Sequence, residues 1–259
     1  MKIGVIGAGA YGTALGGVLE EKGHEVVYYD PAITDKFVHD LVWDAEMVLL
    51  AAPSTAVPEL LLQLDVHTPL IIATKGILKD DIFADFHDVM ALSGPSFADD
   101  MKAKKETFLT VTDDRLVKLF DTDYISFDHT KDLRGVLMCG ALKNVYAIRA
   151  GYLGLKPDMT EHQQFITDVA KEMEEILLAN GAMRDTVYHY CGVDDLKLTC
   201  NLPSRNYEFG MKKRENPDYQ PEKTVEGVAT LARIVAGEIE VPLEASILKE
   251  IINMNVIGG

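Results

Sequence analysis

The stretch KIGVIGAGAYGTALGGVLEEKGHEVVYYD, residues 2–30, decides the fold class. It begins with a short apolar run, residues 2–6, which predicts a buried strand. A GxGxxG pattern follows at Gly7, Gly9 and Gly12, and the residues after it have helical spacing. In such a pattern the first glycine permits a tight turn, the second lets a pyrophosphate approach the backbone, and the third lets the helix pack on the strand. The stretch therefore predicts a strand, loop and helix whose helical N-terminus binds a dinucleotide phosphate.

The second strand of this unit is expected to end at Asp30, eighteen residues after Gly12. A carboxylate at that spacing accepts hydrogen bonds from the hydroxyls of an adenosine ribose. It would repel a 2′-phosphate, so the sequence favours NAD as the cofactor, with NADH preferred to NADPH. The alternative is that Asp30 only opens the turn that contains Pro31.

Alternating strand and helix patterns continue to about residue 130. Further strands are expected within the segments 45–53, 69–76, 87–98, 106–112 and 123–127. The chain between Asp30 and the next strand is short and supplies only a small helix. We therefore predict an α/β fold in which residues 1–130 form a Rossmann-type, doubly wound sheet that binds a dinucleotide.

Two of the expected strands lead into polar residues. One ends in Thr74-Lys75-Gly76, and another leads into the loop Ser93-Gly94-Pro95-Ser96-Phe97-Ala98. Open parallel sheets bind ligands at the carboxyl ends of their strands, so both segments are candidates for a binding site. The alternatives are a solvated loop lysine and a plain turn.

Residues 135–155, GVLMCGALKNVYAIRAGYLGL, predict a long helix that is apolar nearly all round and hence buried. Lys143 and Asn144 lie in its middle, and most neighbours on the face of Lys143 are small: Cys139, Gly140 and Ala147. A lysine in that setting suits a cavity that admits a ligand. The alternative is a lysine that covers apolar surface with its stem and extends its ammonium group to water.

From residue 131 onward the pattern is helical. Further helices are expected at 160–181, near 224–236 and near 243–254. We therefore predict that residues 131–259 form an all-helical C-terminal domain, which follows the nucleotide-binding domain.

Composition excludes several classes of partner. The net charge is −16, from 41 acidic and 25 basic residues, which argues against nucleic acid and anionic membranes. No run is long and apolar enough to span a bilayer, and the N-terminus lacks a signal-peptide layout. The three cysteines have no metal-binding spacing, so we expect no metal site and a reducing, cytoplasmic location. A small anionic substrate would need local lysine or arginine residues.

Seven blocks in both halves of the chain carry a resemblance. They are GAGAYGTALG, ATKGI, LSGPSFA, GALKNVYAIRAG, DDLKLTC, SRNYEFG and VEGVATL. In this order they resemble the NAD-dependent glycerol-3-phosphate dehydrogenase family. The resemblance implies an oxidoreductase that interconverts dihydroxyacetone phosphate and NAD(P)H with sn-glycerol 3-phosphate and NAD(P)+. It implies a small phosphorylated substrate as the partner, and a homodimer is common in that family.

The resemblance also implies roles for individual residues. Lys143 is implied as the acid/base at the substrate oxygen, with Lys75 and Asp195 beside the reacting groups. Substrate contacts are implied for Gly94, Ser96, Thr199, Ser204, Arg205 and Asn206. Cofactor contacts are implied for Gly7, Gly9, Ala10, Tyr11, Gly12, Asp30, Ala98 and Glu226. The planar guanidinium of Arg205 suits a phosphate dianion, because it donates two parallel hydrogen bonds.

The sequence departs from the family pattern in three places. It is shorter after Asp30 and after Leu155, and Asp194 replaces the glycine of a Gly-Asp-Leu motif. Structural readings of the same motifs remain open: Ser204 as a helix cap, and the residues around Asp195 as a cap or turn. Two other functions also remain open. One is a dehydrogenase of the same architecture for another phosphorylated hydroxy compound or hydroxy acid, and the other is a catalytically silent NAD(H)-binding sensor.

Overall fold

The structure, a computed structural model, describes residues 1–35 and 37–254. The chain divides into two compact units, Met1–Leu133 and Arg134–Gly259, which are described separately. No helix among the described residues is long and apolar enough to cross a membrane. All three cysteine side chains are buried.

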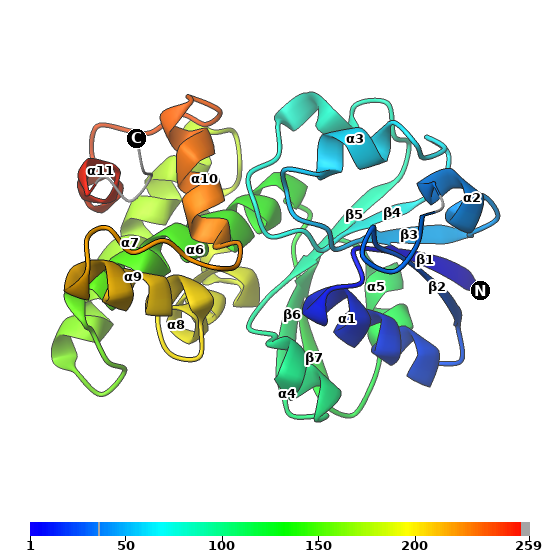
Figure 1. The fold of residues 1–259 in the computed structure, drawn as a ribbon, viewed down its shortest axis with the longest axis horizontal. Helices are drawn as coiled ribbons and strands as arrows, with labels where there is room; N and C mark the ends of the chain where they lie inside the picture. Colours follow the sequence, from blue (N-terminus) through cyan, green and yellow to red (C-terminus); the bar gives the residue numbers. More distant parts are fainter. Residues whose placement is uncertain (36, 255–259) are drawn as a thin grey trace. The chain divides into compact units, whose positions relative to one another are not determined.

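The first unit is built on one sheet of seven strands among its described residues, in the order β2-β1-β3-β4-β5-β6-β7 (Figure 1). The strands are β1 Lys2–Ile6, β2 Glu25–Tyr29, β3 Met47–Leu50, β4 Leu70–Ile72, β5 Val89–Ser93, β6 Thr107–Val111 and β7 Ile125–His129. The helices between them are α1 Ala10–Glu21, α2 Val38–Val42, α3 Val57–Leu61, α4 Ala98–Lys102 and α5 Asp114–Phe120, with a 3-10 turn at Asp80–Phe83. The alternation of strands and helices expected from the sequence is confirmed.

The sheet is mixed rather than wholly parallel, because β5 and β6 pair in antiparallel register. Ser93 lies opposite Thr110, and Leu92 lies opposite Val111. The link between these strands contains only the short α4, so β6 starts near the end of β5 and runs back. The expectation of an open parallel sheet holds for β1 to β5, and β6 and β7 form a parallel pair with the opposite direction.

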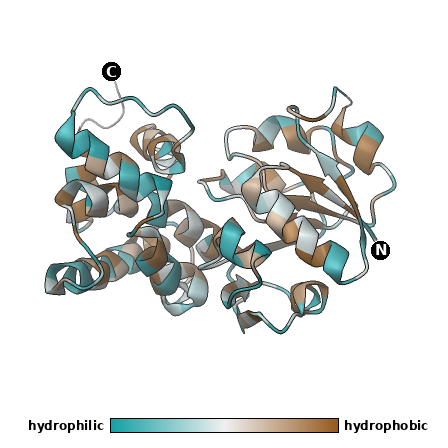
Figure 2. Cartoon of the chain, turned by 60° about the horizontal axis from the view of Figure 1, so that its bottom comes forward, coloured by the Kyte–Doolittle hydropathy of each residue, from teal (hydrophilic) through white to brown (hydrophobic). Residues whose placement is uncertain are grey.

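Alternate residues along the strands are buried on opposite faces of the sheet. Its strands are the brown ribbons at the centre of this unit in Figure 2. On one face, side chains such as Val5, Leu49 and Ile71 form a core with α1, α4 and α5. On the other face, Val42 of α2 lies against Gly4, where an added Cβ would come within 2.6 Å of its Cγ1. This double covering explains why β3 and β4 are apolar at every position.

The described residues of the second unit form helices and helical turns only, as expected. The helices are α6 Leu133–Leu153, α7 Thr160–Ala179, α8 Asp195–Thr199, α9 Arg205–Glu215, α10 Glu226–Val235 and α11 Ser246–Asn253. Two further turns lie at Arg184–Tyr188 and Tyr190–Asp194. α6 is buried over most of its length, and it approaches α9 closely at Gly151 and Gly210. A Cβ on Gly151 would lie 1.9 Å from the carbonyl oxygen of Tyr207, so only glycine fits this crossing.

A buried carboxylate anchors α11. The residue before this helix, Ala245, has no side chain that can cap it. Glu172 of α7 instead accepts hydrogen bonds from the amides of Ile247 and Leu248, each at 2.8 Å, and from the hydroxyl of Tyr146 at 2.7 Å. Burial, reinforced by the adjacent carboxylate, raises the pKa of Tyr146 well above its usual range, so the phenol stays a donor. One carboxylate thus holds α6, α7 and α11 together.

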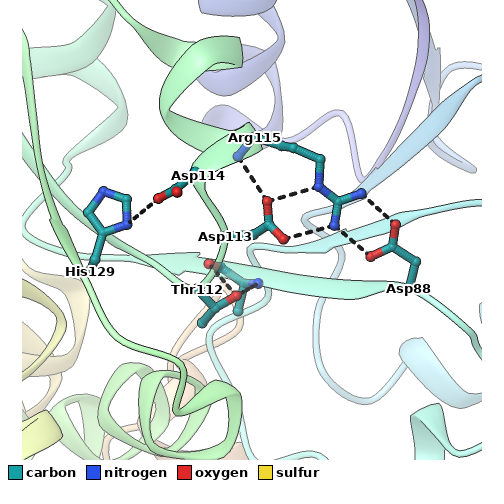
Figure 3. A network of polar contacts seen from close by, with 7 residues as sticks. Asp88, Thr112, Asp113, Asp114, Arg115 and His129 are labelled. Carbon is teal, nitrogen blue, oxygen red and sulfur yellow. Dashed lines mark hydrogen bonds and ion pairs between the residues drawn. The ribbon is translucent and has the colours of Figure 1, made fainter.

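A charged cluster fastens the start of β5 to the end of β6 (Figure 3). Arg115 donates to both carboxylate oxygens of Asp88, at 2.6 and 2.8 Å, and to both of Asp113, at 2.8 and 2.9 Å. Its hydrogen bonds lower the pKa of Asp88, and they lower the pKa of Asp113 from 3.8 to about 2. The bidentate geometry makes this cluster stronger than a typical surface ion pair, although about half of Arg115 is exposed.

Replacement of Arg115 by methionine is expected to lower the free energy of unfolding by about 1 kcal/mol at neutral pH, after solvent screening is allowed for. Because both carboxylates have lowered pKa values in the folded state, their contribution is complete above the unfolded pKa of 3.8. It is lost as the pH falls toward 2. Urea unfolding of both proteins across this range should show the two stabilities converging. A constant difference down to pH 2, or an equal loss in Lys118→Met on the same helix, would contradict the assignment.

Candidate active site

The glycine-rich loop joins β1 to α1, and no side chain caps the start of the helix. Gly7 has a φ of +96°, a conformation that side chains rarely adopt, and an added Cβ would lie 2.6 Å from the amide nitrogen of Ala52. Gly12 lies so close to Gly7 that a Cβ would come within 1.9 Å of its carbonyl oxygen. Gly9, by contrast, precedes the helix without a side-chain cap, and nothing lies within 4 Å of its Cβ position. These contacts fit a pyrophosphate at Gly9 and the exposed first helical residue, Ala10.

Three loops at this edge of the sheet meet at Tyr11, in the first turn of α1. The ammonium nitrogen of Lys75, beyond β4, lies 4.4 Å from the centroid of the Tyr11 ring. The Tyr11 hydroxyl is hydrogen-bonded to the hydroxyl of Ser96, beyond β5, at 3.0 Å. Ser96 in turn donates to the carbonyl oxygen of Gly94 at 2.9 Å. The structure thus brings together Tyr11, Lys75, Ser96 and Gly94, which the sequence singled out separately.

Two other predicted residues of this unit also have defined positions. Ala98 is the first residue of α4 and lies against the core that α1 covers. Asp30 follows β2, and its carboxylate accepts a hydrogen bond from the amide of Ala32 at 2.9 Å. The turn proposed as the alternative for Asp30 is therefore formed. It occupies one carboxylate oxygen, and a ribose contact stays a prediction.

In the second unit, Lys143 of α6 forms an ion pair with Asp195, the first residue of α8. Their side chains are only 3% and 2% exposed, so Lys143 does not extend to water as the alternative reading required. Thr199 donates to the carbonyl oxygen of Asp195 at 2.6 Å, and its hydroxyl lies 3.4 Å from the Oδ1 atom. In the turn before α8, Gly192 packs closely on the chain, because a Cβ there would lie 1.9 Å from the carbonyl oxygen of Val187.

A buried ion pair is poor evidence of a stabilising role, because desolvation of two charges offsets much of their attraction. Buried pairs of a lysine and a carboxylate also occur in catalytic sites. The neighbouring thiol of Cys200 does not compete as an anion, because burial raises its pKa strongly and the Lys143 ammonium opposes that shift only in part. The carboxylate of Asp195 is therefore the anionic partner of Lys143 in this region.

Two asparagines link the lysine helix to α9 and α10. The side chain of Asn144 donates to the carbonyl oxygen of Gly140 at 3.1 Å and accepts from the amide of Asn206 at 2.8 Å. The oxygen of Asn206 accepts from the backbone amide of Gly227 at 2.8 Å. Sequence reasoning did not assign a role to Asn144. Its only signal was a polar residue next to Lys143 on an apolar helix.

The start of α9 holds the remaining predicted residues. Ser204 caps this helix, since its hydroxyl accepts from the amide of Tyr207 at 3.5 Å. Arg205 is exposed, and its Nη1 atom donates to the carbonyl oxygen of Thr224 at 3.4 Å. Burial raises the pKa of Glu226, the first residue of α10, and the charge of Arg205 opposes this shift. The cap expected as a structural alternative is present, and it leaves the guanidinium group at the surface.

Comparison with known proteins gives consistent matches in both units. Residues 2–37 match the family model described as the N-terminus of NAD-dependent glycerol-3-phosphate dehydrogenase, and residues 132–256 match the C-terminus. A glycerol-3-phosphate dehydrogenase [NAD(P)+] of Brucella ovis is 32% identical over 276 residues, which cover 88% of this chain and 85% of the relative. One from Leptospira biflexa is 30% identical and covers 98% and 93% of the two chains.

Solved structures agree on the fold. The crystal structure of a glycerol-3-phosphate dehydrogenase from Coxiella burnetii superposes with a TM-score of 0.75 at 24% identity and covers 96% of this chain and 94% of that one. At this identity the match supports the fold, and the sequence relatives carry the assignment to a family.

Proposed function

Because the chain belongs to the NAD-dependent glycerol-3-phosphate dehydrogenase family, we propose that it interconverts dihydroxyacetone phosphate and sn-glycerol 3-phosphate by hydride transfer, with Lys143 as acid/base. The observation that carries this proposal is the buried ion pair of Lys143 and Asp195. In the proposed mechanism the nicotinamide cofactor supplies or takes the hydride. This chain's residues bind the substrate and move the proton.

Lys143 stabilises the negative charge that develops on the substrate oxygen as the ketone is reduced, and it then donates its proton there. Asp195 orients the ammonium group, and Thr199 in turn helps to position Asp195 through its hydrogen bond to the backbone carbonyl of that residue. In the reverse direction, Lys143 accepts the hydroxyl proton. Lys75 is proposed to supply a second positive charge to the substrate.

The cofactor is proposed to lie along the glycine-rich loop. The open space at Gly9 and the uncapped start of α1 support this placement of the pyrophosphate. Asp30 is proposed to accept hydrogen bonds from the adenosine ribose. Ala98 and Glu226 are proposed as further cofactor contacts.

The test of this function is NADH oxidation with dihydroxyacetone phosphate, with unphosphorylated dihydroxyacetone as the control. Oxidation that is much faster with the phosphorylated ketone would support both the reaction and the recognition of a phosphorylated substrate. NADH binding without oxidation would favour the silent sensor, and oxidation with another hydroxy compound would favour the other dehydrogenase.

Asp30 is expected to set the cofactor preference. The wild-type protein should use NADH with a kcat/KM about tenfold or more above that for NADPH, because the carboxylate repels a 2′-phosphate. Asp30→Ser keeps a side-chain oxygen that can form the turn, and it should lower the ratio of kcat/KM for NADH to kcat/KM for NADPH. Asp35→Ser, an exposed neighbour, serves as the control. A wild-type preference for NADPH would show that the ribose argument is wrong.

Arg205 is expected to bind the substrate phosphate, assisted by Ser204 and Asn206. Arg205→Ala should lower kcat/KM for dihydroxyacetone phosphate by about tenfold to a hundredfold, the effect of losing charged hydrogen bonds. The kcat/KM for unphosphorylated dihydroxyacetone should not change. Lys223→Ala removes an exposed charge from the neighbouring loop and controls for a general field effect. Equal losses with both substrates would contradict phosphate recognition by Arg205.

A further inference from the structure

The ammonium group of Lys75 has an aromatic ring rather than a carboxylate beside it. No carboxylate lies within ion-pair distance of its ammonium nitrogen in the part of the chain that the structure describes. Instead, this nitrogen lies over the face of the Tyr11 ring, 4.4 Å from the centroid. An aromatic face attracts a cation without neutralising it, and it leaves the N–H groups of the ammonium free to donate to a ligand.

The ring is held at its far end as well. The single hydroxyl hydrogen of Ser96 goes to the carbonyl oxygen of Gly94 at 2.9 Å. The Tyr11 hydroxyl must therefore be the donor in its 3.0 Å hydrogen bond with Ser96. Since Ser96 is only 3% exposed, this bond is shielded from water. The Tyr11 ring is thus fixed between the first turn of α1 and the loop after β5.

We propose that Tyr11 is the positioning residue for Lys75, and that its ring holds the ammonium group in place for the substrate while its hydroxyl bond to Ser96 fixes the ring. The assignment of the substrate as the ligand of Lys75 rests on the proposed function. The role extends beyond the contact with the cofactor that the family resemblance implies for Tyr11. It links the glycine-rich loop directly to a substrate lysine.

The same unit contains a matched pair that lacks this role. Lys104 lies over the ring of Tyr124 at 5.9 Å, and the Tyr124 hydroxyl is also bonded, to Glu21. Here, however, Glu21 also pairs with the Lys104 ammonium at 2.8 Å. Substitution of Tyr124 therefore controls for the general effect of removing a tyrosine that contacts a lysine.

A double-mutant cycle tests the coupling. Tyr11→Leu is expected to lower kcat/KM for dihydroxyacetone phosphate by about tenfold, mainly through KM, because the ammonium group is no longer held. In a Lys75→Met background the same substitution should cost less than about twofold, because no cation remains to be positioned. Its effect on the dissociation constant of NADH should be equal in both backgrounds. Tyr11→Phe keeps the ring but loses the hydrogen bond to Ser96, so it should recover only part of the loss. Tyr124→Leu should leave kcat/KM unchanged. Equal losses of kcat/KM in both Lys75 backgrounds would overturn the proposal.

A second measurement does not depend on activity. Reductive methylation with a ¹³C label keeps the charge of each lysine and makes its methyl groups visible by NMR. The signal of Lys75, assigned by its absence in Lys75→Arg, should be shifted upfield by the ring in the wild type and in Tyr11→Phe. It should return to the position of an exposed lysine in Tyr11→Leu. An unshifted wild-type signal would overturn the proposal even if the enzyme is active. A shifted signal in a protein without dehydrogenase activity would uphold the contact and refute only the proposed function.

Discussion

Replacement of Lys143 by methionine should lower kcat for dihydroxyacetone phosphate by about 10²- to 10⁴-fold, the contribution of a positioned acid or base. Methionine fills much of the volume of the lysine stem but has no proton to donate. NADH should still bind with a similar dissociation constant, because the glycine-rich loop belongs to the other compact unit. Stopped-flow kinetics and NADH fluorescence titration measure the two quantities separately.

Two further variants make this result specific. Lys143→Arg retains a positive charge but does not release a proton at neutral pH, so it should remain close to inactive. Lys197→Met removes an exposed lysine from α8, the helix that carries Asp195, and should keep near-normal kcat. A Lys143→Met protein with near-normal kcat would remove Lys143 from the mechanism.

Local sequence patterns predicted the first unit well, because its strands are short apolar runs and its glycines mark the loop between β1 and α1. The direction of β6 was not predicted. The pattern of apolar residues in a strand does not indicate whether the strand pairs parallel or antiparallel to its neighbour. The direction depends on the length and path of the link between the two strands. The length of α2, only five residues, agrees with the shortened segment after Asp30.

Features of the candidate site that depend on a single motif could be predicted from the sequence. Contacts between residues of different motifs could not. The apolar sequence on both sides of Lys143 predicted that its helix is buried, but the pairing with Asp195 spans 52 positions and came from the family resemblance. The contacts of Asn144 with Gly140 and Asn206, and those of Tyr11 with Lys75 and Ser96, were not predicted. Each contact depends on which loops or helices the fold brings together. The periodicity of residues within one segment does not indicate which other segments it contacts.

The buried pair also predicts that stability and catalysis respond differently to the same substitutions. Asp195→Asn leaves the Lys143 ammonium buried without its anion and should lower the free energy of unfolding by about 3–5 kcal/mol. Lys143→Met leaves the carboxylate alone and should cost a similar amount. The double variant removes both charges, so its stability should return to within about 1 kcal/mol of the wild type.

Urea unfolding at neutral pH measures these differences, and kinetic assays accompany it. The adjacent pair of Asp194 and Lys197 is the matched control, because it lies on the same segment with side chains 46% and 56% exposed. Asp194→Asn should change stability by less than about 1 kcal/mol. If the double variant were as unstable as the sum of the single variants, the pair would not be coupled as the structure shows. We expect the double variant to regain stability but to stay inactive. That result would mean that the charges of Lys143 and Asp195 serve the reaction, because the folded state is equally stable without them.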